Sequence, residues 1–308
     1  MLLLPYKLDA NLYRVPFVTL VVCAVCVLTF LMQLDSAHKS QARLQAFCAE
    51  GLTSMQRTLL ERVDDDEESG CAEILVAARR SDDPGDAIDA FAEESTLPVY
   101  DDADQDLRFK QAAFRDAYLR FAAAVPEDLT SRLEDRPGSF DLRRMVTSSF
   151  AHASWMHLIG NLFFFFAFAC CVECVLGPLH FVGCFLAMCF AAGIAYRHGM
   201  PPGGALPTIG LSGVCMGMMA LLTVLLPRSQ VWCLFWVFVW VRRFTLPVIL
   251  IAALYIGWNV YAVRNDEGTE INYAAHVGGA VAGIVLGILY RLFARSRMDA
   301  IAAVADVA

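Results

Sequence analysis

Six long apolar segments constrain the fold of this chain more than any other feature. The hydrocarbon core of a bilayer is about 30 Å thick, and a helix of about 20 predominantly apolar residues crosses it. Segments close to that length recur along the chain: Val15–Leu34, Phe150–Val172, Leu179–Tyr196, Ala205–Leu226, Phe244–Val263 and Tyr273–Leu292. Because lipid offers no hydrogen-bond partners to the backbone, such segments cross it as helices. We therefore expect an all-α polytopic membrane protein with six transmembrane helices.

A seventh apolar stretch is too short to fit this pattern. Ser229–Val241 reads SQVWCLFWVFVWV and is followed by Arg242-Arg243. Tryptophan is enriched at the level of the lipid headgroups. We interpret this stretch as an interfacial or re-entrant piece, with a seventh span as the alternative.

The composition separates an apolar part of the chain from an acidic one. Hydrophobic residues make up 57% of the 308 residues and charged residues only 18%, with a formal net charge of -8. The acidic residues cluster between Glu50 and Asp135. No basic patch interleaved with aromatic residues is present, so we expect no nucleic-acid partner. The division predicts a membrane domain and an acidic segment outside the lipid.

Lysine and arginine in the short loops predict the orientation, because these residues accumulate on the cytoplasmic side. They lie before the first span, between the fourth and fifth, and after the sixth: Lys7, Arg14, Arg228, Arg242, Arg243, Arg291, Arg295 and Arg297. Six spans put these three places on one side. We therefore expect both termini in the cytoplasm, with the chain in a bacterial inner (plasma) membrane. The first span is long for a signal peptide and no A-x-A site follows promptly, so we expect a retained anchor.

The polar stretch after the first span carries two segments with helical apolar spacing, residues 38–63 and 104–125. We expect the following division: residues 1–34 for the cytoplasmic N-terminus and first transmembrane helix, 35–147 for an acidic, mainly helical extracytoplasmic loop domain, 148–293 for the other five helices, and 294–308 for a cytoplasmic C-terminal tail. Cys48 and Cys71 both lie in the loop domain. An oxidising compartment would allow a disulfide between them, which is a hypothesis at this point.

A few polar side chains lie inside otherwise apolar spans, where polar groups are costly and are functional candidates by default. His157 and Asn161 are four residues apart in the second span and share one helix face. Ser212 lies at the start of the fourth span, and His276 about one turn into the sixth. Spans two, four and six run in the same direction, so His157, Ser212 and His276 are expected at a similar depth below the outer surface.

Serine and histidine at one depth favour nucleophilic catalysis. A serine hydroxyl needs a general base within hydrogen-bond reach, and His276 can supply it to Ser212. The oxyanion formed on attack needs donors, which Asn161, His157 and the Ser212 backbone N–H can provide. No Asp or Glu lies at that depth, so these residues predict a dyad rather than a triad.

Small residues on the fourth and sixth spans predict a close helix contact. Gly279 and Gly283 form a G-x-x-x-G pair, and Gly213, Gly217 and Ala220 line one side of the fourth span. Small side chains let two helix backbones approach closely. This approach would bring the serine and the histidine within reach of each other.

Metal and transport functions fit the pattern less well. Cys170, Cys171 and Cys174 have a metal-like spacing, but no second Cys/His cluster follows. His152 and His157 are five apart rather than four, and no H-E-x-x-H motif occurs. A transporter would show an internal repeat or charged pathway residues, and neither is evident. We expect no metal and no cofactor.

The residues from about Arg144 to Leu292, with the first span, resemble the rhomboid intramembrane serine proteases. The motifs that carry the resemblance are TSSFAHASWMHLIGN, VECVLG, GLSGV and AHVGGAVAG, in the same order. The resemblance implies a six-helix core with a catalytic part over 148–293. It implies these roles: Ser212 as nucleophile, His276 as general base, and His157 and Asn161 as oxyanion donors.

The resemblance also implies supporting roles for residues in the same motifs: His152, Gly210, Gly213, Gly279, Gly283, Glu173 and Arg144. Two positions depart from the family pattern. A Trp-Arg pair is common after the first span, and here the place reads Arg143-Arg144. Met216 stands where many bacterial members have an aromatic residue against the catalytic histidine.

The expected function is hydrolysis of peptide bonds in or near the transmembrane segments of single-pass or other membrane proteins. The expected partners are these substrates and the lipid bilayer. The alternative is a non-catalytic rhomboid-like protein that binds client transmembrane helices. Retention of both Ser212 and His276 favours the enzyme, because a binding protein has no use for the pair.

Overall fold

The computed structural model of the chain is mainly helical and describes residues 2–8, 15–61, 70–81, 83–95, 97–136, 140–199, 207–237, 240–265 and 271–294. The chain forms two compact units. The membrane unit contains residues 1–32 and 133–308, and the insertion unit contains residues 33–132. Residues 133–147, which the sequence analysis assigned to the loop domain, thus belong to the membrane unit. The predicted tail lies outside the described residues from position 295 onward.

Five of the described helices are long and apolar enough to cross a membrane: α1 (Phe17–Glu50), α8 (Trp155–Leu176), α9 (Pro178–Gly199), α11 (Val248–Asn265) and α12 (Tyr273–Phe293). The all-α polytopic architecture is therefore confirmed. The sixth apolar helix, α10 (Ser212–Leu225), has only 14 residues and a length of about 21 Å. It is shorter than a full span, so the count of six spans depends on including it.

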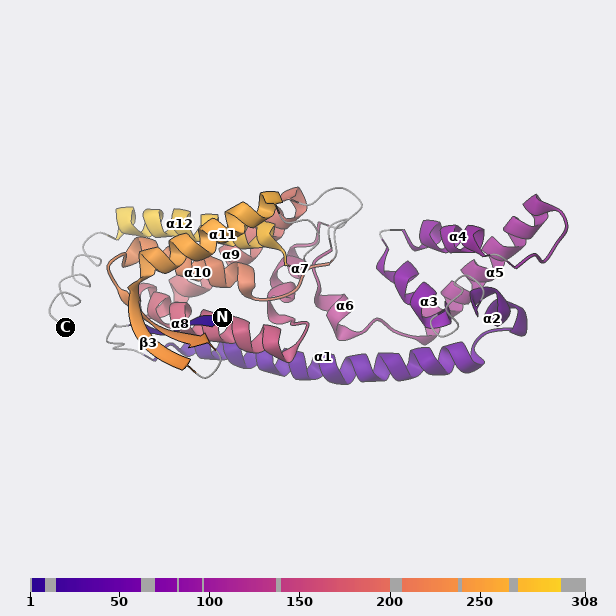
Figure 1. Cartoon of the computed structure of the whole chain (residues 1–308), viewed down its shortest axis with the longest axis horizontal. Coiled ribbons are helices and arrows are strands. Elements are labelled where there is room, and N and C mark those ends of the chain that lie inside the picture. Colours follow the sequence, from indigo (N-terminus) through magenta and orange to yellow (C-terminus); the bar gives the residue numbers. More distant parts are fainter. Residues whose placement is uncertain are drawn as a thin grey trace. The chain divides into compact units, whose positions relative to one another are not determined.

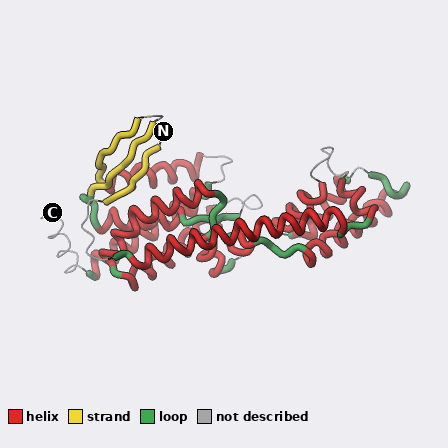
Figure 2. Tube along the Cα trace, turned by 90° about the horizontal axis from the view of Figure 1, so that it is seen from below, coloured by secondary structure: helices red, strands yellow, loops and turns green. Residues whose placement is uncertain are grey.

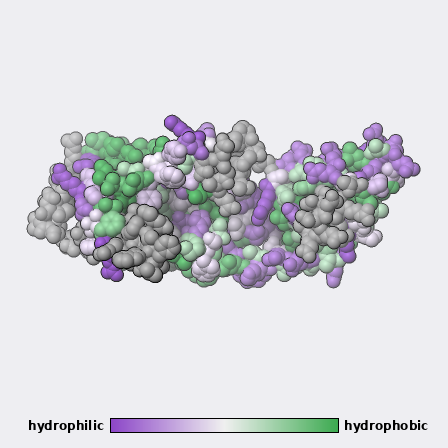
Figure 3. Space-filling view, viewed as in Figure 1, coloured by the Kyte–Doolittle hydropathy of each residue, from purple (hydrophilic) through white to green (hydrophobic). Residues whose placement is uncertain are grey.

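Helix α10 forms the core of the membrane unit. Almost all of its residues are buried, and it packs against α8, α9, α11 and α12 (Figure 1). The outer helices instead expose apolar side chains, which Figure 3 shows gathered over α11 and α12: Ile249, Leu250, Leu254, Val281, Val285 and Ile288. Helix α10 is buried and begins with the polar residue Ser212, while the helices around it expose apolar side chains. This arrangement is expected of a protein that is surrounded by lipid.

The described residues 230–237 and 240–241 of the stretch Ser229–Val241 lie in β-strands, so the alternative of a seventh helical span is wrong. Strands β1 (Leu2–Leu8), β2 (Gln230–Val237) and β3 (Trp240–Pro247) form an antiparallel sheet in the order β1-β2-β3 (Figure 2). Valine and aromatic residues dominate this stretch and favour strands. The expected fifth span consequently begins at Val248 rather than Phe244, directly after Pro247 at the end of β3.

The expected second span also begins later than the apolar pattern indicated. Residues Ser148–Phe150 form a short 3₁₀ helix (η1) after α7 (Leu142–Thr147), and α8 begins only at Trp155. The reason is an N-cap, because the Ser154 side chain accepts a hydrogen bond from the His157 backbone N–H at 3.2 Å. His152 therefore precedes the helix in which the sequence analysis placed it.

Glu173 near the end of α8 caps the start of α1. Its carboxylate accepts hydrogen bonds from the backbone N–H groups of Val18 and Thr19 at 2.8 and 2.7 Å, and from the Thr19 hydroxyl at 2.7 Å. Glu173 is buried. A carboxylate at a helix N-terminus satisfies backbone donors that have no partner within the helix and interacts favourably with the helix dipole.

The insertion unit is a small helical fold with a core of its own. Its helices after α1 are α2 (Ser54–Glu61), α3 (Gly70–Arg80), α4 (Pro84–Glu94), α5 (Ala103–Ala124) and, at its end, α6 (Leu129–Leu133). Buried apolar side chains such as Leu59, Leu75, Ile88 and Phe114 form one cluster. Cys48 of α1 and Cys71 of α3 are joined by a disulfide. Burial of this kind distinguishes a folded unit from a linker.

One ion pair between a buried lysine and a partly exposed aspartate lies near the start of α5 in the insertion unit. Lys110 and Asp106 are 2.7 Å apart, and the second carboxylate oxygen of Asp106 accepts the backbone N–H groups of Val99 and Tyr100. The hydrogen bond from Lys110, with the two backbone N–H groups, lowers the pKa of Asp106 to about 2. The carboxylate therefore stays ionised at any pH near neutral and holds this turn in place.

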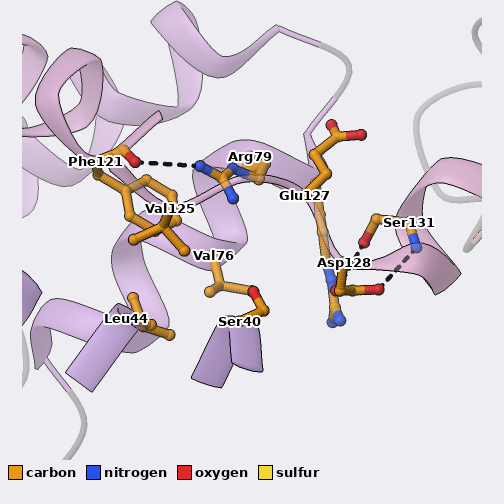
Figure 4. A pocket seen from close by; sticks show the side chains of 10 residues that line it. Ser40, Leu44, Val76, Arg79, Phe121, Val125, Glu127, Asp128 and Ser131 are labelled. Carbon is orange, nitrogen blue, oxygen red and sulfur yellow. Dashed lines mark hydrogen bonds between the residues drawn. The ribbon is translucent and has the colours of Figure 1, made fainter. Parts of the chain in front are cut away.

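Several polar groups that line a pocket in the insertion unit make contacts within the protein (Figure 4). The Arg79 guanidinium lies 3.8 Å from the centre of the Phe121 ring, and Asp128 accepts hydrogen bonds from the Ser131 backbone N–H and hydroxyl. The cation–π contact and these hydrogen bonds are ordinary stabilising interactions. We assign the pocket no function.

Helices α10 and α12 touch through their backbones at glycine. A methyl group at Gly279 would lie 1.9 Å from the Gly213 carbonyl oxygen, and one at Gly283 would lie 2.1 Å from the Gly217 carbonyl oxygen. No side chain fits at such distances, so this approach requires glycine on α12.

We expect Gly279→Ala to destabilise the protein, because the methyl group must push α12 away from α10. Overpacking of this kind costs about 1–3 kcal/mol or more. Thermal unfolding of detergent-solubilised protein measures it as a midpoint lowered by several degrees. Gly183→Ala on α9 is the matched control, since nothing lies within 4 Å of the added methyl group there. Equal midpoints for the two variants would contradict the close contact.

Candidate active site

Ser212 is the first residue of α10, and a tethered loop leads into it. The backbones of Thr208 and Asp135 exchange hydrogen bonds at 2.9 and 3.0 Å, and the Gly210 N–H donates to the Ser148 carbonyl at 2.9 Å. Gly210 has φ +121°, a conformation that L side chains rarely adopt. The loop therefore turns sharply at a glycine and delivers the serine to the helix N-terminus.

His276 on α12 reaches across to this serine. The Asn272 side chain caps α12 by accepting the Ala275 backbone N–H at 3.0 Å, which places His276 in the first turn. His276 Nε2 and Ser212 Oγ are 2.7 Å apart, which is hydrogen-bond distance. Both residues are half-buried. The two side chains come from separate helices that are held together by the glycine contact.

His157 and Asn161 of α8 lie beside Gly210. A methyl group at Gly210 would lie 2.7 Å from His157 Nε2 and 3.4 Å from Asn161 Nδ2. Two side-chain nitrogens therefore face the Cα of Gly210. This glycine precedes Ser212 by two residues. A larger residue at Gly210 would collide with these nitrogens.

The Asn161 amide has an unused donor. Asn161 is 8% exposed, and within the part of the chain that the structure describes its Nδ2 has no hydrogen-bond partner. A buried amide donor without a partner costs free energy, so its persistence needs an explanation. Ser212 follows Gly210 by two residues, and its backbone N–H is in the first turn of α10, where N–H groups have no intrahelical acceptor. Together these donors can stabilise a negative oxygen.

His152 and Tyr273 contact the two histidines of the site. The buried His152 ring stands edge-on to His157, with ring centres 5.2 Å apart, and its Nδ1 lies 3.3 Å from the Phe150 carbonyl. Tyr273 stands edge-on to His276 at 6.2 Å. The ring contact of His152 is thus with His157, one of the two side chains that face Gly210.

The other residues that the sequence analysis named make contacts outside the serine–histidine pair. Glu173 lies 12 residues beyond Asn161 on α8 and caps α1. Arg144 donates to the Glu134 backbone carbonyl at 2.9 Å. Gly213, Gly279 and Gly283 form the helix contact described above, and Cys48 and Cys71 belong to the insertion unit.

The sequence analysis did not single out Asn259, which the structure places against His276. Asn259 of α11 is buried, and its Oδ1 lies 2.6 Å from His276 Nδ1. A signal was present, because an amide within an apolar span is a candidate for function. An amide oxygen can accept a histidine N–H as a carboxylate does, so a span without Asp or Glu can still supply a partner for the ring.

Comparison with known proteins agrees with the motifs of this site. A family model described as Rhomboid domain matches residues 139–293, half of the 308-residue chain. The chain is similar to Rhomboid-like protein 11, chloroplastic, of Arabidopsis thaliana, with 28% identity over 51% of this chain and 55% of the relative. It is also similar to Presenilin-associated rhomboid-like protein, mitochondrial, of Rattus norvegicus, with 26% identity over 46% and 36%.

A third relative is Presenilin-associated rhomboid-like protein A, mitochondrial, of Danio rerio, with 26% identity over 50% of this chain and 39% of the relative. The chain thus spans about half or less of the length of these curated relatives. The family model covers every residue of the site, from His152 through Ser212 and Asn259 to His276. The chain therefore belongs to the rhomboid family.

Proposed function

We propose that this protein is an intramembrane serine endopeptidase in which Ser212 is the nucleophile and His276 the general base. The observation that carries the proposal is the 2.7 Å contact between Ser212 Oγ and His276 Nε2 across two helices. Serine needs a base at this distance to become nucleophilic. The relatives are rhomboid-like proteins of low identity, so the activity rests on this site rather than on their names.

The first half of the reaction acylates the serine. Ser212 Oγ attacks the carbonyl carbon of the scissile peptide while its proton passes to His276 Nε2, and the carbonyl electrons move to the oxygen. Asn161 Nδ2, His157 Nε2 as an N–H donor, and the Ser212 backbone N–H stabilise this oxyanion. The tetrahedral intermediate then collapses, the C–N bond breaks, and His276 returns the proton to the leaving amine nitrogen.

The second half releases the acyl group by hydrolysis. A water molecule gives its proton to His276 Nε2 as its oxygen attacks the ester carbon, and the same donors stabilise the second oxyanion. Collapse of this intermediate frees the carboxylic acid product. The proton passes from His276 back to Ser212 Oγ, which restores the starting state.

The substrate class follows from where the pair lies. Ser212 begins the buried helix α10, and His276 lies in the first turn of α12, which like α8, α9 and α11 is long and apolar enough to cross a membrane. A peptide bond that reaches them belongs to a membrane-anchored protein. We therefore propose single-pass or other membrane proteins as substrates, cut in or near their transmembrane segments.

A non-catalytic scaffold that binds client helices is the second candidate, and the site residues argue against it. A scaffold gains nothing from an amide donor buried without a partner beside a serine–histidine hydrogen bond, since each buried polar group is costly in an apolar surrounding. A scaffold would also have no need of the close α10–α12 contact at Gly279 and Gly283, which brings the serine and the histidine together. These features support the enzyme.

The side of the membrane remains part of the proposal. The basic loops put both termini on one side and the start of α10 on the other. The Cys48–Cys71 disulfide is compatible with an oxidising compartment around the insertion. The matched relatives are chloroplastic and mitochondrial by name, so they give no support to the expected bacterial inner membrane.

We expect Ser212→Ala and His276→Ala each to abolish cleavage of a model single-pass substrate, because either change removes the activated hydroxyl. Purified variants in liposomes, followed by gel analysis of the products, provide the measurement. Thr223→Val is a matched control that removes a hydroxyl at the other end of α10, where it bonds the Met219 carbonyl. Unchanged proteolysis by either site variant, with normal thermal midpoints, would rule out the pair.

We expect Asn161→Ala to lower kcat by about 10- to 1000-fold, with a smaller effect on KM, because the lost donor acts on charge that develops in the transition state. Steady-state kinetics on the same substrate separates the two constants. Turnover at the wild-type rate would mean that the oxyanion is stabilised by other groups.

A further inference from the structure

The Nδ1 atom of His276, on the side of the ring away from Ser212, faces the side-chain amide of Asn259, and this amide has a fixed orientation. Asn259 Nδ2 donates to the Tyr255 backbone carbonyl, one turn earlier on α11, at 2.7 Å. The opposite flip would turn Oδ1 toward that carbonyl oxygen and place two acceptors together. The oxygen of the amide must therefore face His276 Nδ1, from which it is 2.6 Å distant.

This orientation fixes the tautomer of the histidine. An amide oxygen only accepts hydrogen bonds, so Nδ1 of His276 must carry the hydrogen. A neutral imidazole has one N–H, which leaves Nε2 with a lone pair directed at Ser212 Oγ, 2.7 Å away. This is the form that can take the serine proton. The opposite tautomer would turn an N–H toward the hydroxyl and prevent base catalysis.

We propose that Asn259 is a positioning residue that holds His276 in its reactive tautomer and ring orientation, so that the site works as a Ser212–His276–Asn259 triad. This inference rests on the proposed function. In soluble serine proteases a buried aspartate has this role, and cysteine proteases of the papain type use an asparagine. The serine, the histidine and the amide here come from three helices, α10, α12 and α11.

A neutral amide suits the surroundings of this site. Asn259 is 5% exposed, and its neighbours on α11 are mostly apolar and face outward. An ionised carboxylate at such a place would be strongly unfavourable without a full set of partners. The amide supplies the one acceptor that the ring needs and satisfies its own donor on the Tyr255 carbonyl.

The turn that carries the amide is itself held in place. The Tyr255 ring packs edge-on against Phe164 of α8, with ring centres 5.0 Å apart. Phe164 lies three residues after Asn161 on the same helix. The orientation of the amide is therefore linked to α8, which carries the proposed oxyanion donors.

Kinetics of three variants in liposomes test the proposal. Removal of the orienting aspartate of a soluble serine protease lowers kcat by about 10⁴-fold. A neutral amide should contribute less, so we expect Asn259→Leu to lower kcat by about 10- to 100-fold with KM nearly unchanged. Asn259→Asp should recover most of the loss in its protonated form, because one carboxyl oxygen again accepts from His276 Nδ1 while the carboxyl O–H can donate to the Tyr255 carbonyl.

The matched control is Asn265→Leu. Asn265 lies on the same helix and makes the same bond, from Nδ2 to the carbonyl four residues earlier, at 2.8 Å, but it is exposed. Its variant should keep wild-type kcat. A purely structural role for Asn259 would lower the thermal midpoint of both the Leu and the Asp variant without the selective recovery. Wild-type kcat in Asn259→Leu would overturn the proposal.

The tautomer can be observed without any activity. Nitrogen-15 NMR of histidine-labelled protein at mildly alkaline pH distinguishes the two neutral forms, and His276→Gln identifies the signals among the six histidines. We expect the Nδ1–H form in wild type and in Ser212→Ala, and its loss in Asn259→Leu. A wild-type protein without proteolysis but with this tautomer would refute the proposed function alone. Proteolysis by a wild-type protein whose His276 is in the Nε2–H form would refute the role of Asn259 alone.

Discussion

The close approach of α10 and α12 is the constraint on which the rest of the site depends. Without side chains at Gly279 and Gly283, the two backbones meet at the carbonyl oxygens of Gly213 and Gly217. Only at this separation can a short serine side chain on one helix reach an imidazole on the other. The same contact buries α10, a helix too short to span the bilayer, among longer helices that face the lipid.

The polar groups around this contact divide their roles by helix. Helix α10 supplies the hydroxyl and a backbone donor, α12 the imidazole, α8 the two nitrogens over Gly210, and α11 the amide behind the imidazole. Each lies within about two turns of one end of its helix. The cost of burying these groups is kept low because most of them are partnered, and Asn161 Nδ2, which has no partner among the described residues, is one of the donors proposed for the oxyanion.

Much of this could be predicted from the sequence because membranes impose simple rules. Apolar runs identified the helical regions, and the rarity of polar residues within them singled out Ser212, His276, His157 and Asn161. Hydropathy could not show that residues 230–237 and 240–247 pair as strands, because a valine- and tryptophan-rich run is apolar in either conformation. It also could not place the start of α8, which a single Ser154 hydrogen bond determines, nor the pairing of Asn259, which depends on the rotation of α11.

The central claim is that Ser212 is activated by His276, and covalent labelling tests it most directly. A fluorophosphonate reacts with a serine oxygen only where that oxygen is nucleophilic. The account predicts one adduct on folded wild-type protein, mapped by peptide mass spectrometry to Ser212, absent from Ser212→Ala and strongly reduced in His276→Ala. Labelling that persists in Ser212→Ala, or folded wild-type protein that acquires no adduct at Ser212, would contradict it.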